Sequence, residues 1–277
     1  MELTVLVDNN TLIDRYFIGE PGLSFFIRDE DKTILFDVGY SDAFIKNANV
    51  MNIGLNDMDY IVISHGHMDH TWGLFYLIKH YAEAKIEQID FKKPDLLAHP
   101  WTFFPKVDNS NEIGTILTAD TLSRHFNMKL NNDPVWLTKN LVFLGEIERS
   151  NEFENKNAIG KVLCGKKFID DYLLDDTAMV YKSDKGLVII TGCSHAGICN
   201  IIEYAKKVCD DNRIIDVIGG LHLLKPSDEV MTRTCDYFKL SRIQVLHACH
   251  CTDLASKIAL SGTCPIEEVG VGTVLKY

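Results

Sequence analysis

The segment Ser64-His65-Gly66-His67-Met68-Asp69-His70 constrains this chain more than any other part of its sequence. The apolar run Tyr60–Ile63 directly before it predicts a strand, and apolar residues recur at helical spacing after it. We therefore predict a helix from Trp72 to about Ala84. The segment connects the end of a strand to the start of a helix, and such loops often carry binding residues.

Four side chains of this segment carry atoms that bind metal ions, namely those of His65, His67, Asp69 and His70. Imidazole nitrogens and carboxylate oxygens suit zinc, and also iron or manganese. An extended loop can direct His65 and His67 at one ion, while Asp69 and His70 turn toward a second. The chain has ten histidines in 277 residues, so a chance cluster in a polar loop is the weaker interpretation. We predict a metal site here.

This His-x-His-x-Asp-His block between a strand and a helix resembles the metal-binding motif of the metallo-β-lactamase superfamily. Asp37, in Ile34-Leu35-Phe36-Asp37-Val38-Gly39, matches the early Asp-x-Gly of that superfamily and is expected to support the metal loop from behind. The resemblance implies an α/β (α+β) fold. In this fold, two mixed β-sheets face each other in a four-layer αββα sandwich, with helices outside and metals at one edge.

Further segments narrow the resemblance to one branch of the superfamily. That branch includes the dihydropterin–ribofuranosylaminobenzene phosphate synthase of methanopterin biosynthesis, and most of its members are described only as metal-dependent hydrolases. The matching segments, in chain order, are Val5-Leu6-Val7-Asp8-Asn9, Gly22-Leu23-Ser24, Thr191-Gly192-Cys193-Ser194-His195-Ala196-Gly197-Ile198, Gly219-Gly220-Leu221-His222-Leu223 and His250-Cys251-Thr252.

The resemblance also implies ligands after later strands. Gly192-Cys193-Ser194-His195 stands where many relatives have Gly-Asp, so Cys193 occupies the position of the usual bridging carboxylate. We expect His195 to be a ligand. Cys193 is either a bridging thiolate or a small buried side chain, and we prefer the second interpretation. Asp176 is a weaker candidate for the missing carboxylate.

Two histidines compete to complete the second metal site. His250 follows the predicted strand Ile243–Leu246 and a short turn, and is expected to be the last ligand. His222 follows a Gly-Gly turn and is the rival, with substrate contact or proton donation as its other role. A small structural zinc site is a further alternative that lacks a second ligand pair at the usual spacing; it would use His247, Cys249, His250 and Cys251.

Other residues have weaker claims. Asp8 and Asn9 end the first predicted strand, where they either border the site or form a polar turn. Trp72 stands where many relatives have glycine, and it either narrows the pocket, stacks on a substrate ring or packs in the core. Three lysines are candidates for phosphate binding, although a solvated face is the preferred interpretation: Lys161, Lys166 and Lys167.

The order of predicted elements favours a single domain over residues 1–277. Strands and helices alternate, no repeat of fixed period is evident, and no Ser/Pro-rich linker divides the chain. An irregular segment around residues 92–176 is rich in Asn and Asp. Long irregular segments inside a compact domain are often lids or binding loops, so we predict a lid-like insert there.

Composition excludes several classes of protein. The formal net charge of −11 argues against a nucleic-acid binder, which normally carries a basic face. No apolar run is long enough for a membrane span, and the N-terminus lacks the basic region of a signal peptide. The eight cysteines contain no C-x-x-C pair and suggest reduced thiols. We therefore expect a cytoplasmic protein with a small-molecule partner and no membrane or nucleic-acid partner, and leave its oligomeric state open.

These observations predict an enzyme with two divalent metal ions, of which zinc is the first choice and iron or manganese the alternatives. Ions that share a water lower its pKa to about 7, so the first hypothesis is hydrolysis of a small, phosphorylated or other ester. Asp69 is expected to orient the nucleophile or to carry its proton. The alternative is a transferase that releases diphosphate from a pterin. A metal sensor with vestigial activity is a third hypothesis, which the complete motif opposes.

Overall fold

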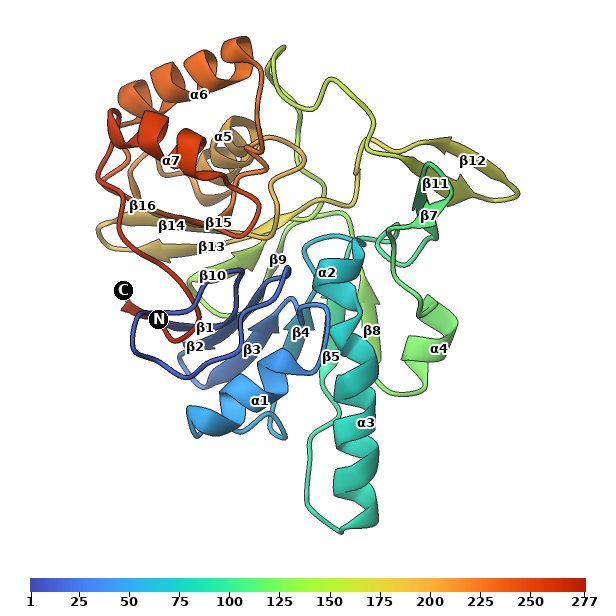
Figure 1. Cartoon of the computed structure of the whole chain (residues 1–277). Helices are drawn as coiled ribbons and strands as arrows, with labels where there is room; N and C mark the ends of the chain where they lie inside the picture. Colours follow the sequence, from blue (N-terminus) through green and yellow to red (C-terminus); the bar gives the residue numbers. More distant parts are fainter. The chain divides into compact units, whose positions relative to one another are not determined.

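The computed structural model describes all residues from Met1 to Tyr277 and divides into two compact units (Figure 1). Unit 1 comprises Met1–Asn131, Gly160–Asp171 and Gly270–Tyr277. Unit 2 comprises Asn132–Ile159 and Tyr172–Val269. No helix of the chain is long and apolar enough to cross a membrane.

Unit 1 is built on a seven-stranded sheet with the strand order β17-β1-β2-β3-β4-β5-β8. The pairs from β17 to β3 are antiparallel, and those from β3 to β8 are parallel. The strands of this sheet are β1 Glu2–Val7, β2 Ser24–Asp29, β3 Lys32–Phe36, β4 Tyr60–Val62, β5 Asp95–Ala98, β8 Asn127–Leu130 and β17 Val274–Lys276. Its helices are α1 Ala43–Val50, α2 Met68–Thr71, α3 Gly73–Ile86 and α4 Ala119–Ser123.

Helix α3 shows why this sequence packs against the sheet. Its residues Leu74, Leu77, Tyr81 and Ala84 recur on one face and are buried, as the helical spacing predicts. They join one apolar cluster with β-strand residues such as Leu35 and with side chains of α1 and α4. The predicted helix after the metal-binding motif is therefore confirmed.

A second, four-stranded sheet in unit 1 has the order β12-β11-β6-β7. Its strands are β6 Lys106–Asp108, β7 Asn111–Glu112, β11 Lys161–Cys164 and β12 Lys167–Asp170. A buried ion pair fastens it, because Lys106 Nζ lies 2.8 Å from Asp171 Oδ2 and both side chains are almost fully excluded from solvent. The pair lies beside the metal-binding motif, where a Cβ added to Gly66 would come within 2.8 Å of Lys106 Cε and 2.1 Å of the Thr102 carbonyl oxygen.

Unit 2 is built on a six-stranded sheet with the order β16-β15-β14-β13-β10-β9, in which β14, β15 and β16 run parallel. The strands are β9 Val135–Trp136, β10 Leu141–Phe143, β13 Ala178–Ser183, β14 Gly186–Thr191, β15 Ile214–Gly220 and β16 Val245–Cys249. The helices are α5 Ile198–Cys209, α6 Asp228–Ser241 and α7 Leu254–Ser261.

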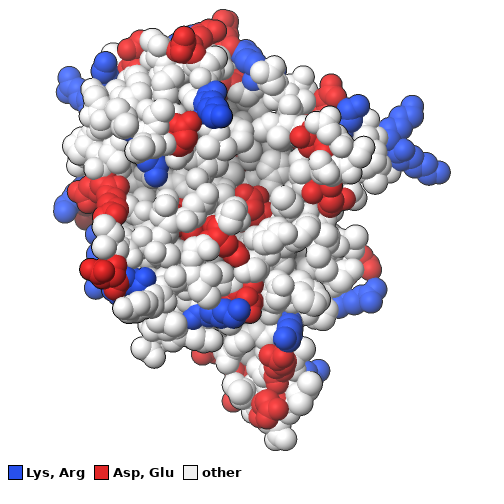
Figure 2. All heavy atoms as spheres, viewed as in Figure 1, with Lys and Arg blue, Asp and Glu red and all other residues white.

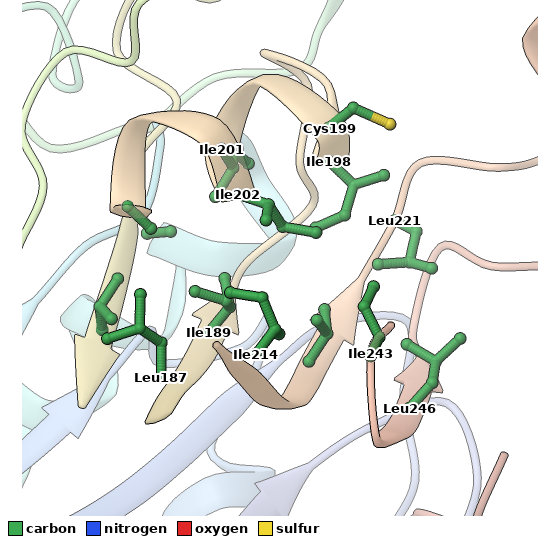
Figure 3. Packing of buried hydrophobic residues seen from close by; sticks show 14 of the residues in the cluster. Leu187, Ile189, Ile198, Cys199, Ile201, Ile202, Ile214, Leu221, Ile243 and Leu246 are labelled. Atoms are coloured by element: carbon green, nitrogen blue, oxygen red, sulfur yellow. The ribbon is translucent and has the colours of Figure 1, made fainter. Parts of the chain in front are cut away.

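The core of unit 2 lies between these helices and one face of the sheet (Figure 3). Ile198, Ile201 and Ile202 of α5 belong to the same buried cluster as Leu187 and Ile189 of β14, and Figure 3 draws Ile202 between the helix and these strand residues. Each such side chain contributes roughly 1.5–3 kcal/mol when fully buried. The apolar face of α5 therefore fixes where the chain leaves β14, which is the segment that carries Cys193 and His195.

The predicted fold class, a mixed α/β (α+β) protein, is confirmed by this arrangement of helices and mixed sheets. One strand boundary was predicted wrongly. The strand predicted as Ile243–Leu246 is β16, Val245–Cys249, because His247, Ala248 and Cys249 continue the parallel pairing with β15. His250 thus follows the strand directly. Residues 92–176, predicted as a lid-like insert, contribute strands to both units, and the single-domain organisation stays a prediction.

We expect Lys106→Met to lower the free energy of unfolding by about 3–5 kcal/mol, because it leaves the Asp171 carboxylate buried without its cation. Lys46→Met is the matched control, since Lys46 makes an exposed pair with Asp42 and should change stability by less than about 1 kcal/mol. Urea denaturation of both variants measures the difference. Equal effects would show that the buried pair has no special role.

Candidate metal centre

In unit 1, the parallel strands β3 and β4 bring Asp37 beside the start of the metal-binding motif. Asp37 follows β3 directly, and its backbone N–H donates to the Val62 carbonyl at the end of β4. The fully buried Asp37 carboxylate accepts hydrogen bonds from the Ser64 backbone N–H and hydroxyl, each at 2.7 Å. It also contacts His70 Nδ1 at 2.7 Å. Asp37 therefore binds the motif from behind, as expected.

These contacts determine which nitrogen of two histidines carries the proton. A carboxylate only accepts, so His70 Nδ1 is the donor and Nε2 is the acceptor nitrogen. The Ser64 hydroxyl already donates to Asp37, so it accepts from His65 Nδ1 at 2.9 Å. Nε2 of His65 is then also an acceptor nitrogen. Metal-binding histidines characteristically donate their other ring N–H in this way.

The remaining candidate ligands of the motif lie against these two histidines. His67 Nδ1 is 3.1 Å from His65 Nε2, so the two nitrogens expected to share one ion face each other. The Asp69 carboxylate lies 3.6 Å from His70 Nε2 and is partly exposed. The structure thus brings together, within unit 1, all four ligands predicted from the motif.

In unit 2, the other candidate residues follow the ends of the three parallel strands. Cys193 and His195 come after β14, His222 after β15, and His250 after β16. Carboxyl ends of parallel strands meet at one edge of a sheet, which is where α/β proteins bind ligands. The Ser194 hydroxyl fastens two of these loops by donating to the Gly220 carbonyl at 2.6 Å.

Cys193 and His250 come close together at this edge. A ring nitrogen of His250 lies within 4.8 Å of Cys193 Sγ, and the cysteine is almost fully buried. Cys251 is a second thiol beside it, and its Sγ accepts from the His222 backbone N–H at 3.2 Å. Although burial raises the pKa of the Cys251 thiol, hydrogen bonds with Cys193 and His222 lower it well below its usual value. The place of Cys193 beside His250 is compatible with both interpretations of Cys193, the bridging thiolate and the buried side chain.

His195 and His222 form a second pair, with ring centroids 4.2 Å apart. His195 is buried, whereas His222 is exposed. The loop of His195 is held by Asp176, whose Oδ2 accepts the Ala196 backbone N–H at 2.8 Å. Burial raises the pKa of Asp176 to about 7, against the lowering effect of the backbone hydrogen bonds from Ala196 and His195. Asp176 therefore holds this loop in place through its Oδ2.

Four residues of these loops have left-handed backbone conformations that the sequence did not reveal. They are Asp37, Ser194, His222 and His250, with φ between 50° and 62°. Non-glycine residues rarely adopt this conformation, and it concentrates at functional sites, where the surrounding structure holds it. The sequence signals this conformation only weakly. Glycine, asparagine and aspartate favour it intrinsically, whereas serine and histidine adopt it here because of the surrounding structure.

The weaker candidates have structural roles within their own units. Asp8 Oδ2 accepts the Asn10 backbone N–H in a turn after β1, with the exposed Asn9 between them. Trp72 stacks on Tyr40 with a centroid distance of 4.9 Å and donates from Nε1 to the Gly114 carbonyl. His247 is held by the carboxylates of Asp216 and Glu267, which weakens the alternative of a structural zinc site.

The lysines considered for phosphate binding are all exposed on the β11–β12 hairpin. Figure 2 shows a group of basic side chains at the place of this hairpin tip in Figure 1, and elsewhere acidic and basic groups intermingle on the visible face. This exposure favours a solvated surface over a phosphate site.

The donors present fit divalent metal ions. Imidazole nitrogens, one carboxylate and a thiol are the groups that zinc binds, and two of the histidines have their acceptor nitrogen fixed by Asp37 and Ser64. The contact between the Asp37 carboxylate and His70 is the usual support of a metal-binding histidine.

Comparison with known proteins agrees with this chemistry. Residues 18–128 match the family model described as the metallo-beta-lactamase superfamily. The 7,8-dihydropterin-6-methyl-4-(beta-D-ribofuranosyl)-aminobenzene-5'-phosphate synthase of Methanocaldococcus jannaschii is 31% identical over 245 residues, which cover 85% of this chain and 82% of that protein. An uncharacterized protein of the same organism is 31% identical over 261 residues, covering 94% and 93%.

Among solved structures, Tm1679, described as a metal-dependent hydrolase of the beta-lactamase superfamily, is similar with a TM-score of 0.84. It is 26% identical, and the match covers 100% of this chain and 99% of that protein. The chain therefore belongs to the metallo-β-lactamase superfamily, whose fold implies binding of divalent metal ions. The predicted resemblance to the branch that includes the synthase is confirmed by the 31% identity.

We expect Asp37→Asn to weaken metal binding by about 10- to 100-fold while the fold is retained. Asparagine tolerates the left-handed backbone at this position, but its amide has one acceptor oxygen for three donors. Competition with a chromophoric chelator measures the affinity. Asp31→Asn, at an exposed aspartate, is the control, and an unchanged affinity in Asp37→Asn would refute the orienting role.

The loop after β14 gives a second test. If His195 is a ligand, His195→Ala should lose metal as removal of any direct ligand does. If Cys193 is a ligand, Cys193→Ser should lose close to half of the metal, because a serine hydroxyl is a poor ligand unless deprotonated. If Cys193 is only packed, Cys193→Ser should cost a little stability and keep its metal. Metal content after gel filtration distinguishes these outcomes.

Proposed function

We propose that this protein is a hydrolase of small esters, phosphoesters in particular, that works with two divalent metal ions, zinc being the first choice. The proposed ligands are His65, His67, Asp69, His70, His195 and His250. The observation that carries the proposal is the contact of the Asp37 carboxylate with Ser64 and His70. The similarity to a metal-dependent hydrolase at 26% identity over the whole chain supports it.

The proposed reaction assigns a role to each group. Divalent ions in this site would lower the pKa of a bound water to about 7 and polarise an ester oxygen. Asp69 orients the attacking water and takes up its proton, for which its partly exposed carboxylate is suited. His222, exposed beside His195, donates a proton to the leaving oxygen. Asp37 keeps His65 and His70 in the tautomers that metal binding needs.

A transferase is the second candidate. It is supported by the 31% identity to the dihydropterin synthase, and it would release diphosphate from a pterin substrate before a carbon–nitrogen bond forms. Both candidates place a phosphate-bearing small molecule at the metals. They differ in the acceptor, which is water in the first and an aromatic amine in the second. The cytoplasmic location and the absence of a nucleic-acid partner stay predictions.

We expect about two metal ions per chain in protein purified without chelator. His67→Ala should lose metal and turnover yet keep its far-ultraviolet circular dichroism spectrum, because a core of this size folds without the metals. Elemental analysis is to be combined with a screen of phosphodiesters, phosphomonoesters and a dihydropterin diphosphate with an arylamine. Protein without metal, or with a single tetrahedral cysteine-rich ion, would contradict the proposal.

A further inference from the structure

Unit 2 contains a cavity of about 430 Å³ that opens beside His195 and His222. Its walls are the loop around residues 152–159, the segment after β15 and the start of α6. This volume lies within the range of small-molecule sites in proteins. The roles assigned above use only His195 and His222 of its lining and leave the rest of the cavity without a function.

Hydrogen bonds hold the loop that forms one wall. The Glu154 carboxylate accepts the backbone N–H groups of Cys199 and Asn200 in the first turn of α5, both at 2.9 Å. The Asn200 side chain in turn accepts the Asn151 backbone N–H at 3.1 Å. Asn155 donates to the carbonyl of His195 at 2.9 Å. The wall is therefore formed before any ligand binds.

Glycine at position 197 makes this close approach feasible. A Cβ there would lie 2.4 Å from atoms of the Glu154 side chain, and the backbone of Gly197 has a φ of 98°. A side chain at this position would push the loop away from α5. The loop, the helix and the His195 segment thus fit together around one glycine.

The charges around the cavity disfavour an anionic ligand. A helix N-terminus normally attracts anions, and two helices start at the cavity. However, the carboxylate of Glu154 already occupies the N-terminus of α5. Ser227 caps α6, and Asp228 and Glu229 fill its first turn. Lys156 is the single lysine or arginine in the lining, which also contains His195 and His222.

Part of the lining is apolar and includes an aromatic ring. Leu221, Leu223 and Val230 contribute aliphatic surface, and Leu221 belongs to the core cluster drawn in Figure 3. Phe153 also lines the cavity, and its ring is held by the Arg233 guanidinium at 4.5 Å from the ring centroid. A fixed aromatic ring offers a stacking surface for a flat ligand group.

We propose that this cavity binds the non-reacting part of the substrate, and that this part is an uncharged or cationic ring-bearing group. The lining is acidic, and carboxylates already stand at the starts of both helices. An anionic substrate group in the cavity would therefore be repelled. The scissile bond then lies at the end of the cavity that His195 and His222 border. The assignment to the substrate rests on the proposed function, whereas the binding preference of the cavity does not.

Three single-ring probes of similar size and different charge test this preference: benzamidine, benzyl alcohol and benzenesulfonate. They are titrated into the full-length protein as purified, and methyl resonances of Leu223 and Val230 are followed by NMR. Benzamidine and benzyl alcohol should shift these resonances, and benzenesulfonate should bind at least about tenfold more weakly. Equal binding of all three probes, or no shift at these residues, would overturn the proposal.

Variants locate the binding and test the charge argument. Glu229→Gln should weaken benzamidine about three- to fivefold and leave benzyl alcohol unchanged, whereas Asp236→Asn, an exposed charge farther along α6, should affect neither. Val230→Phe should block all binding by filling the cavity. Because Val230 packs against the core, Ile159→Trp in the loop wall is the second blocking variant. Unchanged binding in a folded blocking variant would also overturn the proposal.

The test separates this inference from the proposed function. If the neutral and cationic probes bind in the cavity but no ester is hydrolysed, the hydrolase proposal fails and the cavity preference stands. If esters are hydrolysed but the probes do not bind there, the cavity proposal fails alone. Where both hold, phosphodiesters with a neutral aromatic leaving group should have at least about tenfold higher kcat/KM than those with an anionic one.

Discussion

One buried carboxylate orders the metal-binding half of unit 1. Asp37 accepts three hydrogen bonds at 2.7 Å, two from Ser64 and one from His70. The Ser64 hydroxyl, which donates to Asp37, accepts a hydrogen bond from His65 Nδ1 and so fixes the tautomer of His65. A buried carboxylate without such donors would be costly, so the motif and Asp37 stabilise each other. The position of the four motif side chains therefore follows from the parallel pairing of β3 and β4.

In unit 2, a different kind of contact holds the candidate residues in place. These residues follow three neighbouring parallel strands, and backbone contacts across the strand ends hold them. Three residues at these strand ends, Ser194, His222 and His250, have left-handed backbone conformations, which cost of order 1–3 kcal/mol each. The apolar cluster under α5, α6 and α7 opposes that cost (Figure 3). Packing away from the site thus sustains conformations that the local sequence would not adopt by itself.

The clustering of the motif side chains and the fold class could be predicted because their signals are local. His65, His67, Asp69 and His70 stand within six residues, and helix α3 has a regular apolar face. The extent of β16 was missed because His247 and Cys249 interrupt its apolar run, and only pairing with β15 shows that the strand continues. Residues 92–176 looked irregular because their short strands pair with partners distant in sequence, as in the parallel pairing of β5 and β8. The tautomers of His65 and His70 and the walls of the cavity in unit 2 also depend on contacts between residues far apart in the sequence.

The attachment of the loop around residues 152–159 has an evolutionary consequence. Glu154 binds the first turn of α5 through backbone N–H groups, and Asn155 binds His195 through a backbone carbonyl. Backbone groups are present whatever side chains surround them. Neighbouring loop positions such as Lys156 and Asn157 are exposed and are free to vary as long as the two anchoring side chains and Gly197 persist. Related sequences can therefore change the wall of the cavity in this one loop, with the candidate histidine ligands left untouched.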